Sequence, residues 1–487
     1  MSSKKIKKVM LLTPPAFTSR DATDINPIPP LGLGYLGAVL EERGIEVKIF
    51  DSLIEGFHNR THIDKDTVRI GAPFAMIEDE IKRFSPDILG VSNLFSRQSE
   101  NAHEIYRLAK KIDSRMVVIA GGAHPSVLPE AVMEDRNVDF VVIGEGEYTL
   151  KTLIDCLENG ATFDKLDGIA FRENGKIKVC PKKYFIEDLD SLPFPAWHLL
   201  GITKYFGLSS SHGSRRCEKF SPIVTSRGCP IGCAFCTAHH VWGKNFRKRS
   251  PENVIKEMKE LKDKYDIEEL LFEDDNVTLD VKRGERIFDL MIEERLNLKW
   301  DTPNGVAAFA LDEALIKKMK DSGCYKLNIA VESGNKDVLK NIIKKPLDLE
   351  KVKRLIKYAR SIGLQTGIFL IIGMPGETLD QIWDSYRFAR EVKIYDAFVS
   401  VATPYPGSEL YKICTENKYV DAERLLENLY ISSFSVSTEN WTRDDLRRTF
   451  KRGYYYLKMH FYKTHPLLFL RRLAKRIFLF PITKVFR

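Results

Sequence analysis

Cysteine is scarce in this chain, with only eight residues in 487. A small secreted protein that depends on disulfides carries a much higher density, so a disulfide scaffold is excluded and a reducing cytoplasm is expected. The sequence also lacks any apolar run near the roughly 20 residues that span a bilayer. The apolar segment Val9–Leu12 is too short for a signal peptide and predicts a buried first strand.

Acidic residues are absent after Asp445, whereas residues 447–487 contain 12 lysines and arginines. The net charge of +8 therefore belongs to this end, and the rest of the chain is mildly acidic. Nucleic-acid binding is not expected of such a body. In 465–481, basic residues alternate with Leu, Ile and Phe, which predicts either peripheral contact with an anionic membrane, at its inner face, or an amphipathic helix packed on the protein.

Strand and helix patterns divide the α/β chain into four regions. Residues 1–160 alternate short apolar strands with helices, which predicts a doubly wound, Rossmann-like parallel sheet. Residues 161–215 read as a hairpin and a linker rich in Pro and Ser. Residues 216–420 contain six further strand–helix units, typical of a partial or full βα barrel, and 421–487 are expected to be a helical, basic region. The barrel strands are predicted at 223–226, 270–272, 305–308, 326–331, 367–372 and 398–402.

Three of the eight cysteines, Cys229, Cys233 and Cys236, lie within eight residues. Their spacing, C-x3-C-x2-C, places three thiolates on one loop after the first barrel strand, where each can bind one iron of a [4Fe–4S] cubane and leave the fourth iron open. Two other interpretations stay open: a zinc site completed by His239 or His240, and three structural thiols. Iron, sulfide and zinc analysis separates the three.

The cysteine pattern resembles the radical S-adenosylmethionine (SAM) superfamily, over about residues 222–415. The resemblance implies that SAM chelates the open iron and that an electron from a donor such as flavodoxin or ferredoxin cleaves it to a 5′-deoxyadenosyl radical. It also implies that residues at the barrel strand ends contact SAM. The alternative is that these strand ends are ordinary capping turns or strand termini without a ligand. The expected cofactor contacts are Phe235, Asp274, Asp275, Glu332, Ser333 and Gly373.

The first region lacks a dinucleotide fingerprint, because no strand runs directly into the glycines of 32–37. It resembles cobalamin-binding domains, whose pattern is D-x-H-x-x-G, then S-x-L, then G-G. Leu53 stands where those domains place the cobalt-ligating histidine, so the resemblance implies base-off cobalamin. The alternative is a Rossmann-like domain without a ligand. The expected contacts are Asp51, Leu53, Gly56, Ser92, Leu94, Gly121, Gly122, His124 and Glu145, with His124 equally able to bond its own loop.

Both resemblances together, in this order along the chain, resemble the cobalamin-dependent radical SAM family. They imply a methyltransferase that uses one SAM to methylate cobalamin and another to make the radical. The expected acceptor is an unactivated carbon of a lipid, an isoprenoid or another small molecule. Two alternatives remain: a radical cyclase or oxidase of the same family, and a non-catalytic iron–sulfur or cobalamin sensor.

Overall fold

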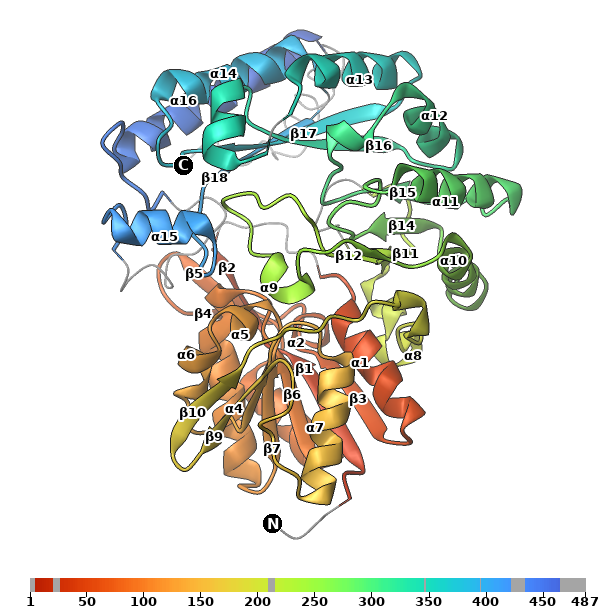
Figure 1. The fold of residues 1–487 in the computed structure, drawn as a ribbon, viewed down its shortest axis with the longest axis vertical. Helices are drawn as coiled ribbons and strands as arrows, with labels where there is room; N and C mark the ends of the chain where they lie inside the picture. Colours follow the sequence, from red (N-terminus) through yellow and green to blue (C-terminus); the bar gives the residue numbers. More distant parts are fainter. Residues whose placement is uncertain are drawn as a thin grey trace, which may run out of the picture.

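The computed structural model describes residues 5–20, 27–208, 215–345, 347–394, 396–421 and 434–464. It contains two α/β bodies stacked end to end (Figure 1). The first body, coloured red to yellow, carries the N-terminal sheet, and the second, green to blue, carries the barrel strands. The basic segment 465–487 lies outside the described residues, and so does most of the Ser-rich linker loop.

The first domain is built on a seven-stranded sheet with the order β10-β9-β8-β7-β6-β1-β3. The five strands from β8 to β3 in this order are parallel, as the apolar runs predicted. The hairpin of β9 and β10 adds to β8 in antiparallel fashion, so the predicted hairpin extends the first sheet. The strands are β1 (Lys8–Thr13), β3 (Glu46–Asp51), β6 (Ile88–Ser92), β7 (Val117–Gly121), β8 (Phe140–Val142), β9 (Ile169–Glu173) and β10 (Lys176–Cys180).

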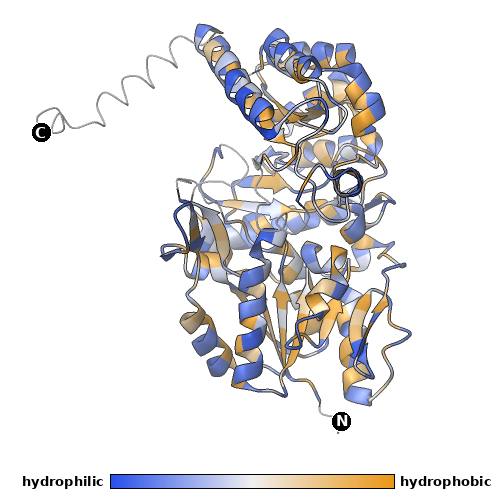
Figure 2. Ribbon diagram, turned by 90° about the vertical axis from the view of Figure 1, so that its left-hand side faces the viewer, coloured by the Kyte–Doolittle hydropathy of each residue, from blue (hydrophilic) through white to orange (hydrophobic). Residues whose placement is uncertain are grey.

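Alternate residues of β1 show why its sequence is continuously apolar. Met10 and Leu12 pack in a cluster with the helices on one face, whereas Val9 and Leu11 pack in a second cluster on the other. A parallel sheet covered on both faces needs apolar side chains at every position. Figure 2 shows the apolar strands enclosed by helices with hydrophilic outer faces. The covering helices are α3 (Phe74–Phe84) and α4 (Ser99–Ile112) on one face, and α1 (Leu31–Glu42) and α7 (Glu147–Asn159) on the other.

A small antiparallel sheet, not predicted from the sequence, follows the carboxyl ends of β1 and β3. It consists of β2 (Ala16–Ser19), β5 (Thr67–Ile70) and β4 (Arg60–His62), in the order β2-β5-β4. These strands have three or four residues each, and the pairing partners are about 50 residues apart for β2 and β5. Strands this short carry too little alternation to be recognised locally.

The second domain is a partial barrel of six parallel strands in two groups of three. Single bridges from Trp300 to Cys324 and from Val306 to Ile329 connect the groups. The third strand was predicted at 305–308 and lies instead at Lys299–Asp301, because Trp300 is the only large apolar residue there and its charged neighbours hide the strand. The strands are β11 (Phe220–Ile223), β14 (Glu269–Phe272), β15 (Lys299–Asp301), β16 (Lys326–Glu332), β17 (Gln365–Ile372) and β18 (Asp396–Val401).

The barrel helices begin at residues that cap them. Ser250 accepts a hydrogen bond from the Asn253 amide at 3.2 Å, and Thr378 forms a capping box with Gln381. The helices are α10 (Pro251–Tyr265), α11 (Val281–Glu293), α12 (Glu313–Asp321), α13 (Leu349–Ser361), α14 (Leu379–Glu391), α15 (Glu409–Glu416) and α16 (Arg443–Thr464). The long α16 lies along α14 (Figure 1). In the described part of the chain, no helix is long and apolar enough to cross a membrane.

Short elements make the connections between these layers. The first domain also contains α2 (Ser52–Glu55), α5 (Ala123–Val127) and α6 (Pro129–Met133). The linker contributes α8 (Trp197–Leu200), and the segment around the cysteines contains β12 (Ser226–Arg227), α9 (His239–Trp242) and β13 (Arg247–Lys248). In Figure 1, α9 lies between the two bodies.

Replacing Gly56 by Ala is expected to destabilise the first domain by about 3 kcal/mol, because an added methyl group is overpacked there. Its Cβ would lie 2.1 Å from the Ala72 backbone nitrogen, which cannot move aside as a side chain does. Chemical denaturation measures the change. Gly32→Ala is the matched control, since no atom lies within 4 Å of its Cβ position, and it is expected to be neutral or slightly stabilising. Equal effects of both changes would contradict this packing argument.

Candidate active site

The cysteine loop follows β12 and is fixed at its start and at its middle. Gly228 has φ +85°, and a Cβ there would lie 2.2 Å from the Asn245 carbonyl oxygen, so only glycine fits. In the middle, the Ala234 amide donates to the Ile343 carbonyl at 3.0 Å, and the Ala234 carbonyl accepts from the Leu410 amide at 2.8 Å. Segments that follow β16 and β18 therefore hold the loop over the carboxyl ends of the barrel strands.

All three cysteines are partly buried free thiols. Burial raises the pKa of Cys229 and Cys236, and raises that of Cys233 to about 12. Among the described residues, no three His, Cys, Asp or Glu side chains converge on one ion. A cubane does not require such convergence, because each thiolate binds a different iron. His240, one suggested zinc ligand, has its Nε2 3.0 Å from the Gly407 carbonyl oxygen.

Lys345 brings a buried positive charge to the cysteines. Its ammonium group lies 2.9 Å from a Glu332 carboxylate oxygen, and both side chains are almost completely buried. Burial opposes the charge of Lys345, but Glu332 and then Cys233 and Cys229 act in the other direction, and the pKa of Lys345 is raised. The charged lysine favours the thiolate form of Cys233. This lysine was not predicted from the sequence, because nothing in the local pattern distinguishes it from the neighbouring surface lysines.

The two aspartates after β14 differ in what they contact. Asp274 accepts hydrogen bonds from the Thr225 amide and hydroxyl and from the Ser226 hydroxyl, so its carboxylate holds the strand that leads into the cysteine loop. Asp275 has a buried oxygen, Oδ2, without a hydrogen-bond partner. Burial and then Asp274 raise the pKa of Asp275 to about 6. An unpartnered carboxylate oxygen close to the cysteines suits a cationic ligand such as an amino group.

The other strand-end residues of the barrel also differ in how their side chains are engaged. Glu332 has φ +67°, an uncommon conformation for a residue with a side chain. The Ser333 hydroxyl lies 3.3 Å from the Ser385 hydroxyl and faces α14. Gly373 has φ +82°, and a Cβ there would lie 2.6 Å from Leu446 of α16. Phe235 packs against the barrel core.

The carboxyl edge of the first sheet presents polar and apolar groups that contact little else. Asn93 Oδ1 and Ser52 Oγ are buried without a hydrogen-bond partner. Leu94 and Phe95 follow β6 and are 52% and 66% exposed. A methyl group added at Gly121 would meet no atom closer than 4.0 Å. This combination of open backbone, unused hydrogen-bonding groups and exposed apolar surface fits a large, flat macrocycle with a polar periphery.

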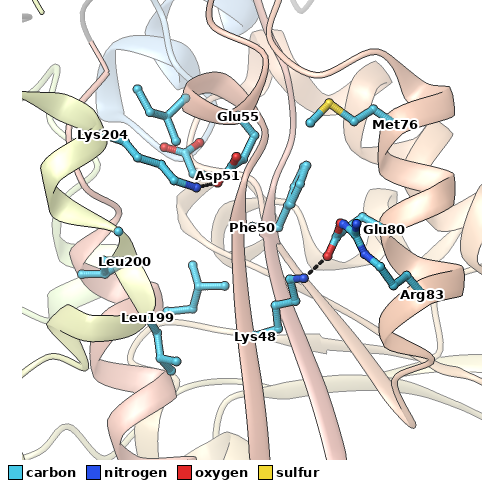
Figure 3. Close-up of a pocket in the computed structure, with 13 residues that line it drawn as sticks. Lys48, Phe50, Asp51, Glu55, Met76, Glu80, Arg83, Leu199, Leu200 and Lys204 are labelled. Carbon is cyan, nitrogen blue, oxygen red and sulfur yellow. Dashed lines mark hydrogen bonds and ion pairs between the residues drawn. The ribbon is translucent and has the colours of Figure 1, made fainter.

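Asp51 faces the linker. Its carboxylate accepts hydrogen bonds from the Tyr205 hydroxyl at 2.6 Å, from the Thr13 hydroxyl and from the Leu53 amide, so it has little capacity left for a cofactor. It lines a cavity of about 300 Å³ beside the edge strand β3, shown in Figure 3. Lys48–Glu80 and Lys204–Glu55 ion pairs lie at this cavity. The cavity contains none of the cysteines or barrel strand ends.

His124 and Glu145 were both predicted to contact the corrin, and both side chains bond to protein. The Nδ1 of His124 lies 2.9 Å from the Ser96 hydroxyl, and burial lowers the pKa of His124 to about 4. Glu145 is fully buried, and its carboxylate bonds to Arg227, to Arg247 and to the Ile186 amide. The Glu145 side chain therefore serves the contact between the domains, and its expected role as a cofactor contact stays a prediction.

Comparison with known proteins identifies both halves. Residues 223–389 match the model of the radical SAM superfamily, and residues 22–154 match that of the B12 binding domain. Over 472 residues the chain is 37% identical to the cytidylyl-2-hydroxyethylphosphonate methyltransferase of Streptomyces wedmorensis, covering 90% of this chain and 86% of that protein. It is 32% identical to an uncharacterized methyltransferase of Pyrococcus horikoshii, covering 89% and 90%.

The fold agrees with these relationships. A structure of the radical SAM methyltransferase TsrM from Kitasatospora setae, with cobalamin and a [4Fe–4S] cluster bound, aligns with a TM-score of 0.67. The sequences are 17% identical, and the alignment covers 92% of this chain and 85% of TsrM. A cobalamin-dependent radical SAM enzyme, OxsB, aligns with a TM-score of 0.64 over 92% of this chain and 61% of OxsB.

A Rossmann-like domain with an open carboxyl edge and a barrel with three loop cysteines, together with the two family matches, identify a radical SAM enzyme with a corrin domain. The chain belongs to the cobalamin-dependent radical SAM methyltransferase family. Its cofactors are a [4Fe–4S] cluster, SAM and cobalamin, and the residues described above fit all three. The predictions of family, fold class and cofactors are confirmed, whereas the individual cofactor contacts and the domain boundaries stay predictions.

The depressed pKa of His124 makes the stability of the protein depend on pH. The unfolded histidine takes up a proton near pH 6.5, whereas the folded one does so only near pH 4, so stability is lost as the pH falls between these values. At pH 5 the contribution is about 2 kcal/mol. Denaturation at pH 7 and pH 5 is expected to show a smaller loss for His124→Gln than for the unmodified protein. An identical loss in both proteins would contradict the assignment.

Proposed function

We propose that this enzyme transfers a methyl group to an unactivated carbon of a small molecule. Similarity to the Streptomyces wedmorensis methyltransferase, 37% identity over nine-tenths of the chain, carries this proposal. The cysteine loop and the carboxyl edge of the first sheet meet through α9 and α5, which supports a shared reaction cavity. The cofactors, when bound, would supply two reactive groups: a 5′-deoxyadenosyl radical, which removes a hydrogen atom from the acceptor, and a methyl group carried on cobalt, which takes its place.

The protein's own contribution is to bind, orient and shield. Cys229, Cys233 and Cys236 would hold the cluster, and Lys345 offsets the negative charge that three thiolates create in a buried place. The free oxygen of Asp275 would accept a hydrogen bond from the SAM amino group. Leu53 offers no ligand to cobalt, which agrees with cobalamin bound base-off.

The acceptor that we propose to test first is a nucleotide-linked hydroxyalkylphosphonate, the substrate type in the name of the Streptomyces relative. A lipid or isoprenoid acceptor, the other class expected from the sequence, has a weaker basis. It is supported by a hopanoid C-3 methylase of Methylococcus capsulatus, 24% identical over 78% of this chain. The proposed electron source is a reduced flavodoxin or ferredoxin. Contact of the basic C-terminal end with a membrane face is proposed only if the acceptor is a lipid.

The decisive experiment is anaerobic incubation of the reconstituted enzyme with SAM, cobalamin, a reductant and each acceptor. We expect a product heavier by one methyl group, together with 5′-deoxyadenosine and S-adenosylhomocysteine, detected by mass spectrometry. Cys233→Ala is expected to lower 5′-deoxyadenosine to background and to lower bound iron, because one cubane ligand is lost. A product lighter by hydrogen would indicate cyclisation, and one heavier by oxygen would indicate oxidation, in place of methyl transfer. Absence of 5′-deoxyadenosine would leave only a binding role.

The neighbouring Asp274 and Asp275 are expected to respond differently to replacement by Asn. Asp275→Asn should weaken SAM binding roughly 10- to 100-fold, because a charge-assisted hydrogen bond is lost. The folded state and the cluster content should change little. Asp274→Asn replaces one of the two acceptor oxygens that serve three donors by an NH2 group, and it is expected to lower stability and cluster content together. Equilibrium SAM binding, iron analysis and thermal denaturation distinguish them, and equal SAM affinity in Asp275→Asn and the unmodified enzyme would contradict the assignment.

A further inference from the structure

Four charged side chains form a buried network between the two domains. Arg227 Nη1 lies 3.0 Å from Glu145 Oε1, and its Nη2 lies 2.7 Å from Glu147 Oε1. Arg247 Nη1 lies 2.7 Å and 2.9 Å from the two Glu145 oxygens. None of the four side chains is more than 6% exposed. Two guanidinium groups and two carboxylates thus neutralise one another away from water.

The partners come from opposite sides of the domain junction. Glu145 and Glu147 lie at the turn between β8 and α7 of the first sheet, at its carboxyl edge. Arg227 and Arg247 are paired across the antiparallel ribbon of β12 and β13. Since residues 228–246 between them contain all three loop cysteines, the network holds both ends of the cysteine segment on the first domain.

Both arginines make further contacts at this attachment. The Arg227 guanidinium lies 5.1 Å from the ring centre of Tyr35 on α1 and 5.0 Å from that of Trp242 on α9. Arg247 also donates to the Ile186 carbonyl at 2.7 Å and to the Trp242 carbonyl at 2.6 Å. Arg227 and Arg247 therefore each contact both the first domain and α9, the helix that follows the cysteines.

Burying four paired charges contributes little net free energy to folding. The cost of removing such groups from water is comparable to the attraction gained, and apolar replacements are often as stable. The best-attested use of a buried ionic network is to fix one register between packed elements, because a shifted arrangement leaves a charge unpaired. A planar guanidinium that bonds in two directions is suited to this purpose.

We propose that Glu145, Glu147, Arg227 and Arg247 are positioning residues that fix the cysteine loop relative to the corrin-binding edge. They set the separation between the site of radical formation and the site of the methyl donor. The inference rests on the family assignment and on the structure, and it does not depend on which acceptor is methylated. Loss of the network would separate the two half-sites while leaving each cofactor bound.

The test compares Glu147→Gln with Glu257→Gln in the full-length enzyme carrying both cofactors. The first change removes one charge from the network and retains a hydrogen-bond acceptor. The second removes an equally buried carboxylate that pairs with Arg249 and belongs to neither arginine of the network, so it is a matched control for lost buried charge. Arg247→Lys is a second network variant, which keeps the charge but cannot reach Glu145, Ile186 and Trp242 together.

Two readouts do not require turnover. Electron paramagnetic resonance of cob(II)alamin beside the reduced cluster reports their separation through the spin coupling. Amide hydrogen exchange reports opening of the junction at α5 and α9. For Glu147→Gln and Arg247→Lys we expect weaker spin coupling, and we expect the amide exchange rate at the junction to rise roughly tenfold or more. The cobalamin and iron content should stay unchanged. Unchanged coupling and exchange in both network variants, or equal changes in Glu257→Gln, would overturn the proposal.

Discussion

Two guanidinium groups and two carboxylates, all withdrawn from water, connect the cysteine segment to the corrin domain. Each charge is tolerated only while its partners stay in place, so the network allows few alternative arrangements of the junction. The rest of the active region depends on this constraint. Because the network attaches β12 and β13 to the first domain, the cysteine loop that connects these two strands lies between the first sheet and the barrel.

The same physical problem, a charge without water, recurs at the cysteines. Burial leaves the three thiolates poorly solvated and raises the pKa of each thiol, and the neighbouring cysteines add to the rise at Cys233 and Cys236. Lys345 supplies a compensating charge and is itself stabilised by Glu332. Asp275, by contrast, has a buried oxygen without a donor. A cationic ligand would complete the balance, as the SAM amino group does in our proposal.

Local patterns predicted much of the fold. The apolar strands of the first sheet and the strand–helix units of the barrel were predicted because continuous apolar runs and their alternation with helical segments are local properties. The third barrel strand was misplaced, since Trp300 stands among charged residues and its strand is defined by its neighbour β14. The sheet of β2, β5 and β4 was missed for a similar reason, because its pairing is not local.

The sequence by itself determined the two cofactor modules, because cysteine spacing, strand ends and the missing histidine at Leu53 are read along the chain. Only the tertiary structure decided what individual side chains do. Glu145 resembles a cofactor contact in the sequence, yet it pairs with arginines about 80 and 100 residues away. Asp274 and Asp275 look equivalent, yet only Asp274 meets donors at Thr225 and Ser226. The bonds of a buried charge depend on which distant groups surround it, and no local pattern records them.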